Sequence, residues 1–405
     1  MIKINNAKNI EGNLINIEIP SEENQEINAE GLTLLPGLID PHVHFRTPGM
    51  EYKEDWRTAA LAAIYGGYTY VFDMPNVVPP TITSERLKEK KALINSQLKD
   101  ANIPLRYELF FGADKNHFDQ IEKIKNDVIG IKVFMGCSTG DLVIDDDESL
   151  HKIFKLGKDN DLLVAVHAED EHILKSNKAN FKGEMDYPAH SEIRSLDAAR
   201  VAVKKAIDLS RQYGTKLYIL HVTSIAELEL IKAAKEEGLN VYAETTPHHL
   251  FLDTESYPEL KGRAVINPPL RTKEHRETIL NAIHDGTIDT IGSDHAPHKL
   301  SEKEQPYGSC PSGMPGIETT LPLLLNAYND GLLSLQEIVN LTSKNAAKIF
   351  DLESYTDCVL VDLNKEQIID EKNLKTKCAW SSFNGLTLKG APVYTILNGR
   401  VFDLR

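Results

Sequence analysis

The amino-acid sequence predicts an α/β protein, a (β/α)8 TIM barrel joined to a small β-sandwich-like domain that both chain ends form. Three observations lead to this fold class. Eight short apolar segments recur between residues 34 and 294, longer amphipathic segments separate most of them, and the two chain ends show only short alternating patterns. Strands that alternate with helices indicate a parallel sheet, and eight such units are typical of a closed barrel.

The eight predicted barrel strands share apolar, often β-branched residues, a composition that fits a buried parallel strand. They are Leu34–Asp40, Tyr68–Met74, Leu105–Phe111, Ile129–Met135, Leu162–His167, Lys216–His221, Asn240–Thr245 and Thr290–Asp294. The clearest predicted helices carry apolar residues at three- and four-residue spacing, which suits a helix that packs on a sheet. They are Ser84–Lys99, Ser195–Tyr213 and Ile225–Gly238.

The chain ends predict a second, smaller domain. Residues 1–33 and 353–405 read as short alternating strands, with Asn-Gly turn signals at 384–385 and 398–399. The barrel, residues 34–352, is therefore predicted to be an insertion between the two parts of this β domain. After the eighth strand, Lys299–Thr319 is rich in Gly, Pro and Ser and has no periodicity, so we expect a long loop, where loops are often functional.

Composition restricts the partners and the compartment. The 405 residues include 45 basic and 60 acidic side chains, a net charge of −15, which argues against a nucleic acid or an anionic membrane as the main partner. No apolar run is long enough to span a bilayer and the first residues lack a signal-peptide core, so we expect a cytoplasmic protein. The four cysteines have no CxxC spacing and are expected to be reduced thiols. We expect a homodimer.

Polar residues at the predicted strand ends indicate a metal site. His42 and His44 are two apart in an extended segment, so their side chains point to the same side. His167, His221 and Asp294 end the fifth, sixth and eighth predicted strands. Each alone is as readily explained as a core residue with satisfied hydrogen bonds. Together they lie where barrel enzymes place their catalytic groups, which favours shared metal ligation.

Lys132 is the unusual residue of the fourth predicted strand, since it interrupts the apolar run of residues 129–135. A buried ammonium group is costly and its pKa is lowered. A neutral lysine amine can add carbon dioxide to form a carbamate, N6-carboxylysine, whose two oxygens could bridge two divalent ions. The alternative is a lysine whose amine extends past the strand end to solvent.

The donor set predicts the reaction class. Imidazole nitrogens with carboxylate-type oxygens and no sulfur suit two Zn²⁺ ions, with Mn²⁺ or Co²⁺ as substitutes. Two metal ions lower the pKa of a shared water, so that hydroxide exists near neutral pH. Asp294 could accept its proton and transfer it to a leaving nitrogen. We therefore expect hydrolysis or its reverse.

Three further residues predict what the substrate carries. Arg46, Asn76 and His298 follow the first, second and eighth predicted strands and are expected at one rim. A guanidinium fork, an amide and an imidazole that converge suit a carboxylate. The alternative for Arg46 is a salt bridge with a loop acid.

The motifs taken together resemble the dihydroorotase family, within the cyclic amidohydrolases of the amidohydrolase superfamily. They cover nearly the whole chain, and the sixth and seventh are the most specific for that family. They are PGLIDPHVHFR (36–46), DMPN (73–76), GIKVFMG (130–136), VHAE (166–169), TPHH (246–249), NPPLR (267–271) and SDHAPH (293–298).

The resemblance implies a binuclear zinc barrel that interconverts N-carbamoyl-L-aspartate and L-dihydroorotate in pyrimidine (UMP) biosynthesis. It implies as metal ligands His42, His44, Lys132 as its carbamate, His167, His221 and Asp294, the last also being the general acid/base. It implies as substrate contacts Arg46, Asn76 and His298 for the carboxylate, and Asn267 with the backbone around Pro315 and Gly316 for the ring. A loop that closes over substrate would correspond to Ser138–Gly140.

Several alternatives remain at this point. Some dihydroorotases bridge their metals with a loop aspartate. Its counterpart here would lie in Asp145–Asp147, although this sequence also has Lys132. Another cyclic amidohydrolase, such as a dihydropyrimidinase, hydantoinase or allantoinase, would share the metal ligands but leave the carboxylate-binding set unexplained. A non-catalytic barrel scaffold would be expected to lack ligands, and none is missing. His248 and His249 are expected to be structural.

Overall fold

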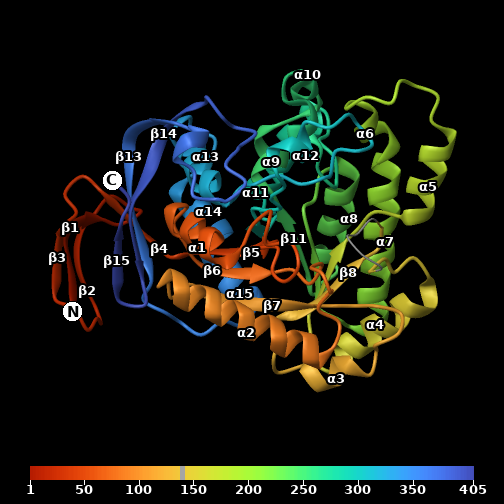
Figure 1. The fold of residues 1–405 in the computed structure, drawn as a ribbon, viewed down its shortest axis with the longest axis horizontal. Helices are drawn as coiled ribbons and strands as arrows, with labels where there is room; N and C mark the ends of the chain where they lie inside the picture. The colour runs from red at the N-terminus through yellow and green to blue at the C-terminus, as the bar shows by residue number, and fades with distance from the viewer. Residues whose placement is uncertain (137–141) are drawn as a thin grey trace.

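The computed structural model describes residues 1–136 and 142–405, and its strands form two sheets (Figure 1). One is an eight-stranded parallel barrel and the other a seven-stranded sheet made from both chain ends. This architecture confirms the predicted fold class.

The barrel strands are hydrogen-bonded to one another in sequence order. They are β5 (Leu38–Val43), β6 (Tyr68–Asp73), β7 (Arg106–Gly112), β8 (Gly130–Phe134), β9 (Val164–His167), β10 (Leu217–Ile219), β11 (Val241–Thr245) and β12 (Thr290–Ile291). The circle closes just past β12, where His295 forms a parallel bridge with Val43 and its carbonyl accepts the N–H of His44 at 2.9 Å. Closure therefore brings the first and last strand ends, and the predicted ligands on them, side by side.

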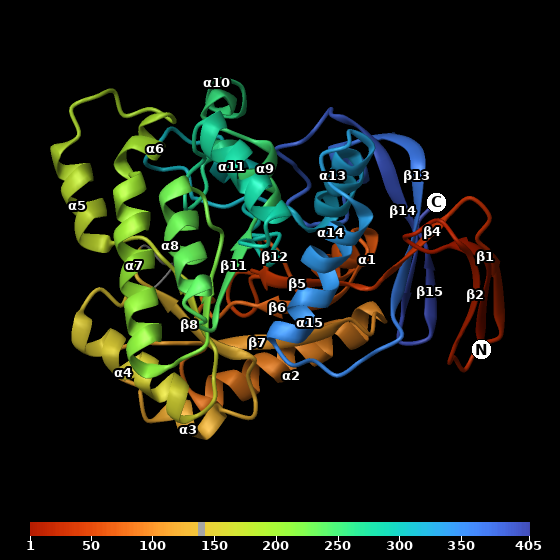
Figure 2. The ribbon, with the colours of Figure 1, turned by 180° about the vertical axis from the view of Figure 1, so that it is seen from behind.

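Helices form the outer layer, as Figure 2 shows for α4, α7 and α8. Their main members are α1 (Trp56–Tyr65), α2 (Ser84–Ala101), α3 (Gln120–Ile124), α4 (Asp147–Asp159), α7 (Leu196–Tyr213), α8 (Ile225–Glu236), α11 (Lys273–His284) and α13 (Ile317–Asn329). The sequence explains α7 in detail. Ser195 caps it by accepting the N–H of Ala198, a face that includes Ala202 and Ala206 is buried, and Gly214 ends it in the left-handed region. The predicted helices at 84, 195 and 225 are confirmed.

Shorter elements complete the connections. They are α5 (Glu171–Asn180), α6 (Ala189–Ile193), α9 (Pro247–Phe251), α10 (Tyr257–Leu260), α12 (Leu300–Lys303), α14 (Leu335–Val339) and α15 (Asn345–Ile349). The predicted long loop after the last strand is interrupted by α12, and α13 begins before that loop was expected to end. No helix in the described part of the chain is long and apolar enough to cross a membrane.

The first predicted strand, Leu34–Asp40, is two strands that belong to different sheets. β4 (Thr33–Pro36) pairs antiparallel with β13 (Cys358–Ile368), whereas β5 pairs parallel with β6. Gly37 is the junction, and a side chain there would collide with Thr69. The apolar run is continuous across the junction because both strands are buried, so hydrophobicity alone does not show the break.

The terminal sheet has the strand order β15-β14-β13-β4-β1-β2, with β3 beside β1. Its remaining strands are β1 (Ile2–Lys8), β2 (Leu14–Ile19), β3 (Gln25–Asn28), β14 (Thr387–Leu397) and β15 (Arg400–Asp403). Ile2 and Ile4 from the N-terminal half share one apolar core with Leu360 and Ile396 from the C-terminal half. Asn398 and Gly399 both have positive φ and join β14 to β15, as the turn signal predicted.

A buried ion pair ties α2 to the end of β6. The Lys90 ammonium lies 2.5 Å from the Asp73 carboxylate and donates to the Met74 carbonyl at 2.8 Å, and both charged side chains are fully buried. We expect Lys90→Met to lower the free energy of unfolding by about 3 kcal/mol, because it leaves Asp73 buried without a counter-charge. Urea denaturation followed by circular dichroism measures this. Lys91→Met, at the adjacent and more exposed lysine, is the control and should change stability little. Equal stability of the two variants would contradict the expectation.

Candidate active site

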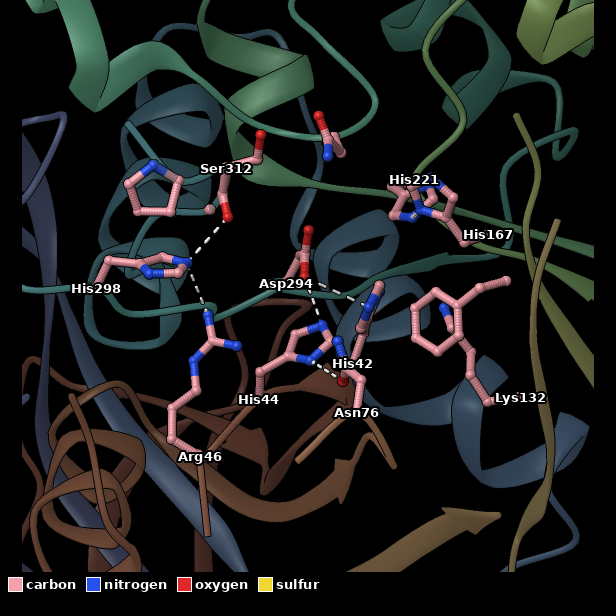
Figure 3. A pocket seen from close by; sticks show the side chains of 14 residues that line it. His42, His44, Arg46, Asn76, Lys132, His167, His221, Asp294, His298 and Ser312 are labelled. Carbon is pink, nitrogen blue, oxygen red and sulfur yellow. Dashed lines mark hydrogen bonds and ion pairs between the residues drawn. The ribbon is translucent and has the colours of Figure 1, made fainter. Parts of the chain in front are cut away.

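A cavity of about 200 Å³ lies at the carboxyl ends of the barrel strands (Figure 3). All the predicted metal ligands and four of the predicted substrate contacts line it. The lining residues are His42, His44, Arg46, Asn76, Lys132, Phe134, His167, His221, Asn267, Asp294, His298, Pro311, Ser312 and Gly313. The structure therefore brings the predicted residues, from His42 to His298, together in one place.

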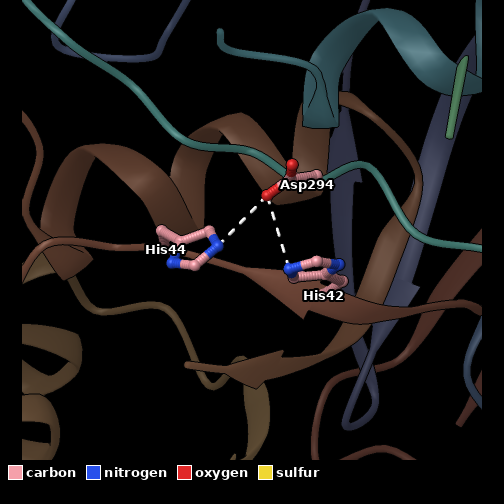
Figure 4. Close-up of side chains that lie close together, drawn as sticks. All are labelled: His42, His44 and Asp294. Atoms are coloured by element: carbon pink, nitrogen blue, oxygen red, sulfur yellow. Dashed lines mark ion pairs between the residues drawn. The ribbon is translucent and has the colours of Figure 1, made fainter. Parts of the chain in front are cut away.

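His42, His44 and Asp294 form a group that can hold a metal ion (Figure 4). The Nε2 atoms of His42 and His44 lie 3.4 and 3.1 Å from Oδ1 of Asp294. The other ring nitrogens are occupied, since Nδ1 of His42 is 2.7 Å from Glu244 and Nδ1 of His44 is 2.8 Å from the Asn76 amide oxygen. Acceptors at Nδ1 place the proton there and leave each Nε2 lone pair for a metal.

His167 and His221 form a second pair next to the first, with the rings of His221 and His42 5.5 Å apart between centroids. Nδ1 of His167 lies 2.9 Å from Nε2 of His221. Nε2 of His167 donates to Glu169 at 2.8 Å, and Arg194 holds Glu169 by an ion pair. Because Nε2 carries the proton, the lone pair of His167 points from Nδ1 toward His221, and a cation between the two rings would satisfy both. The donor set thus fits a second metal ion.

Lys132 is enclosed beside these histidines. It is 1 % exposed, and its Nζ lies 4.7 Å from the centre of the Phe134 ring. No carboxylate of residues 1–136 or 142–405 forms an ion pair with it. Burial, opposed in part by Asp294 and Glu244, lowers the pKa of Lys132 to about 7. The amine does not reach solvent, as the alternative required, and a neutral form that can react with carbon dioxide is accessible near neutral pH.

Burial also keeps the four histidines unprotonated. It lowers the pKa of His42 to about 3 and that of His44 to about 4, and it lowers the pKa values of His167 and His221 as well. Neutral imidazole is the form that binds metal ions. At Asp294, burial raises the pKa, but the neighbouring His42 and His44 outweigh it and hold the pKa below its usual value.

Arg46 and His298 form the other wall of the cavity. Nη2 of Arg46 lies 3.1 Å from Nε2 of His298, and Nε of Arg46 donates to the Pro297 carbonyl at 3.1 Å. Arg46 is 4 % exposed, and no carboxylate in the described residues forms a salt bridge with it, which removes the alternative of a loop acid. The amide oxygen of Asn76 accepts the hydrogen bond from His44, so the NH2 group of Asn76 remains for a ligand. Arg46 and the Asn76 amide are thus donors without a carboxylate partner among the described residues, whereas His298 has Glu302 3.9 Å from its Nδ1.

Two predicted substrate contacts lie elsewhere. Pro315 and Gly316 do not line the cavity, and the N–H of Gly316 donates to Nδ1 of His295 at 3.2 Å. The segment 311–313 of the same loop lines it instead. The ring contact Asn267 does line the cavity, and its amide oxygen lies 3.0 Å from Nε2 of His190.

The other residues that the sequence singled out are the loop aspartates, the expected closing loop and the TPHH histidines, and none of those in the described part of the chain lines the cavity. Asp145 pairs with Lys115 at 2.6 Å and Asp146 caps α4, so neither lies at the cavity. Ser138–Gly140, the expected closing loop, falls outside the described residues. His249 hydrogen-bonds the Thr246 hydroxyl and the Pro268 carbonyl, the kind of structural contact expected of it, while His248 is buried beside it.

Sequence reasoning missed the residues that orient the ligands. Glu244 and Glu169 bind the outer nitrogens of His42 and His167 and are fully buried. The signal was present, since each is an acid within or directly after an apolar strand. A buried carboxylate requires a partner, and in a strand-end cluster of histidines that partner is an imidazole.

The backbone at three site residues adopts the left-handed region. Arg46, His221 and Asp294 have φ of 63°, 40° and 42°. For residues other than glycine this conformation is uncommon and costs of order 1 kcal/mol or more, and it concentrates at functional sites. It turns each chain segment sharply just after a strand, which directs these side chains into the cavity.

Comparisons with known proteins show which family the chain belongs to. Residues 33–402 match the sequence profile described as the amidohydrolase family. A dihydroorotase of Methanosarcina acetivorans is 34% identical, over 94% of this chain and 84% of the relative. A dihydroorotase of Methanosphaera stadtmanae is 32% identical, over 99% and 96%.

Solved structures of cyclic amidohydrolases share the fold. L-hydantoinase (dihydropyrimidinase) from Arthrobacter aurescens superposes with a TM-score of 0.91 at 26% identity, over 99% of this chain and 95% of that one. Dihydropyrimidinase from Brevibacillus agri superposes with a TM-score of 0.86 at 26% identity, over 98% and 94%. Because the family profile covers nearly the whole chain and the two dihydroorotases are more than 30% identical to it, the chain belongs to the amidohydrolase family of hydrolases.

Proposed function

We propose that this chain is a zinc-dependent dihydroorotase, which interconverts N-carbamoyl-L-aspartate and L-dihydroorotate in pyrimidine biosynthesis. One observation carries the choice of substrate. The Arg46 guanidinium faces the cavity without a salt bridge to any carboxylate among the described residues, and L-dihydroorotate carries a carboxylate on its ring. The relatives named dihydroorotase support the same choice.

The metal ligands proposed are the two histidine pairs, Asp294, and Lys132 as a carbamate that joins the two metal positions. Divalent metal ions bound there would activate a water and polarise the amide carbonyl of the ring. Nitrogen and oxygen donors without sulfur favour zinc for both positions.

The protein's own groups would orient the substrate and move the proton. Arg46, Asn76 and His298 hold the carboxylate, which presents the ring amide to Asp294. The Asp294 carboxylate accepts the proton from the attacking water and delivers it to the ring nitrogen as the carbon–nitrogen bond breaks. In the reverse direction the same carboxylate takes a proton from the ureido nitrogen that closes the ring. Its low pKa means that it starts ionised, as a base must.

Dihydropyrimidinase or hydantoinase activity is the second candidate. It is favoured by the superposition with L-hydantoinase, at a TM-score of 0.91. Dihydrouracil and hydantoin lack the ring carboxylate, so they would leave Arg46 and His298 without a role in binding.

Substrate comparison with an Arg46 variant separates the two. We expect the zinc-loaded protein to consume L-dihydroorotate faster than dihydrouracil, hydantoin or allantoin. Arg46→Ala should lower kcat/KM for L-dihydroorotate about 100-fold, because a charge-assisted hydrogen bond to the carboxylate is lost. Loss of ultraviolet absorbance of each ring measures the rate.

Arg57→Ala is the matched control, since Arg57 is half-exposed on α1 and pairs with Asp100 on α2. It should leave kcat/KM unchanged. A higher kcat/KM for dihydrouracil or hydantoin, insensitive to Arg46→Ala, would reject dihydroorotase and select the second candidate.

A further inference from the structure

Lys53 is a buried lysine that approaches the cavity from behind His298. It lies between β5 and α1 and is 8 % exposed. Its Nζ is 2.8 Å from Nδ1 of His298 and 3.2 Å from Oε1 of Glu302. Lys53 is not one of the residues that line the cavity, so it reaches the ligand space only through the imidazole.

His298 has a defined partner at each ring nitrogen. Nδ1 faces the Lys53 ammonium, while Nε2 lies 3.0 Å from the Ser312 carbonyl oxygen and 3.1 Å from Nη2 of Arg46 (Figure 3). An ammonium and a guanidinium can only donate, and a carbonyl can only accept. Oε2 of Glu302 is also near Nδ1, but at 3.9 Å it is beyond hydrogen-bond distance. The imidazole must therefore accept at Nδ1, where Lys53 is a donor, and donate at Nε2, where the Ser312 carbonyl is an acceptor.

His298 is neutral, so only one of its two ring nitrogens carries a proton. Burial and the neighbouring cations Arg46 and Lys53 lower the pKa of His298 far below its usual value, so the ring is neutral and carries one proton. Nδ1 accepts from Lys53, and the proton then resides on Nε2, where it is donated to Ser312. The Arg46 N–H that lies 3.1 Å from Nε2 consequently finds no acceptor on the imidazole.

We propose that Lys53 is a positioning residue for recognition of the substrate carboxylate, which it serves by fixing His298 as the Nε2–H tautomer. In the free protein Nε2–H donates to Ser312 and cannot accept from Arg46, so the Arg46 N–H stays available to the anion. Without Lys53 the proton is free to move to Nδ1, and Nε2 becomes an acceptor that satisfies Arg46 and repels a carboxylate. The inference rests on the proposed function for the identity of the anion, whereas the tautomer itself does not depend on it.

Glu302 pairs with Lys53 and favours its charged form. Burial lowers the pKa of Lys53, and the hydrogen bond and charge of Glu302 oppose that shift. Glu302 belongs to α12, the short helix that begins two residues after His298. The Lys53–Glu302 ion pair therefore joins the segment after β5 to the segment after β12, next to Nδ1 of His298.

The kinetic test is Lys53→Met, which removes the donor and keeps the length of the side chain. We expect KM for L-dihydroorotate to rise about 10- to 100-fold, the loss typical of one charge-assisted contact, with kcat within about threefold. Lys53→Arg retains a donor and should recover most of the affinity. Lys299→Met is the control, because Lys299 is an exposed lysine near the same site, with its Nζ 5.0 Å from the Tyr52 ring centre, and its loss changes the net charge equally.

The spectroscopic test is the ¹⁵N NMR spectrum of the zinc-loaded protein labelled at histidine, with the His298 signals assigned by their loss in His298→Asn. We expect protonated Nε2 and unprotonated Nδ1 in the wild type, and a mixture or reversal of tautomers in Lys53→Met. A substitution that disturbs only side-chain packing would not change which nitrogen carries the proton. The wild-type spectrum alone tests the tautomer even if Lys53→Met fails to fold.

The outcomes separate the two proposals. Protonated Nδ1 in the wild type, or a KM that Lys53→Met leaves within twofold, would overturn the role of Lys53. A wild type that does not consume L-dihydroorotate would overturn the proposed function, while the tautomer measurement would still decide whether Lys53 orients His298.

Discussion

Asp294→Asn is expected to lower kcat for L-dihydroorotate by about 1000-fold or more, the scale of losing a general acid/base and a charged ligand together. The carboxylate lies 3.1 to 3.4 Å from the free ring nitrogens of His42 and His44 and lines the same cavity as the carboxylate-binding residues. Asparagine has the same shape, but it bears no negative charge and cannot take up a proton. The variant should therefore fold and bind substrate while failing in the chemical step.

Steady-state rates together with metal content by mass spectrometry check this. Asp159→Asn, at a half-exposed aspartate paired with Lys155 on α4, is the matched control and should retain full activity. If Asp294→Asn kept more than a tenth of kcat with its metal content intact, another group would have to carry the proton.

Lys132→Ala is expected to remove one of two bound metal ions and to lower kcat/KM about 1000-fold, because several kcal/mol of electrostatic stabilisation is lost with that ion. Lys132 is enclosed next to His167 and His221, and its pKa of about 7 makes the neutral amine accessible. The truncated side chain leaves a space in which a small carboxylate could stand in for the carbamate. Added acetate or propionate should therefore restore part of the activity and the second metal.

Metal stoichiometry, activity with and without acetate, and ¹³C NMR after addition of labelled bicarbonate are the measurements. Lys152→Ala serves as control, since the Lys152 ammonium also lies over a phenylalanine ring, that of Phe118, but away from the cavity. Two metals per chain and undiminished activity in Lys132→Ala would exclude the carbamate bridge.

The sequence was sufficient to predict which strand ends carry the site. A barrel places the carboxyl ends of all its strands on one rim, so His42, His167 and Asp294 had to approach one another once the strands were identified. The outer partners were harder to predict, because whether Glu244 meets His42 depends on the stagger between β5 and β11. Apolar periodicity defines strands but contains no information on stagger across a closed sheet.

Irregular segments were the least predictable. Left-handed backbone at Arg46 and His221 has no signature in residue type, since glycine or asparagine is the usual occupant. The segment of the last loop that lines the cavity is 311–313 rather than the predicted 315–316, because a loop without periodicity does not show which of its residues will reach the cavity. The split at Gly37 was hidden for a related reason, namely that both flanking strands are buried.

The terminal sheet has a consequence for biosynthesis. Its inner strand β4 hydrogen-bonds β13 along its length but meets β1 at a single residue pair, so most of its partners are translated only after the whole barrel. Every barrel strand, and the helices that cover them, leave the ribosome before β13 does. The nascent chain must therefore hold β4 as an unpaired edge next to a nearly finished barrel, a stage at which such an edge is exposed to other chains. Pairing with β13 ends that exposure, more than 300 residues after β4 has been translated.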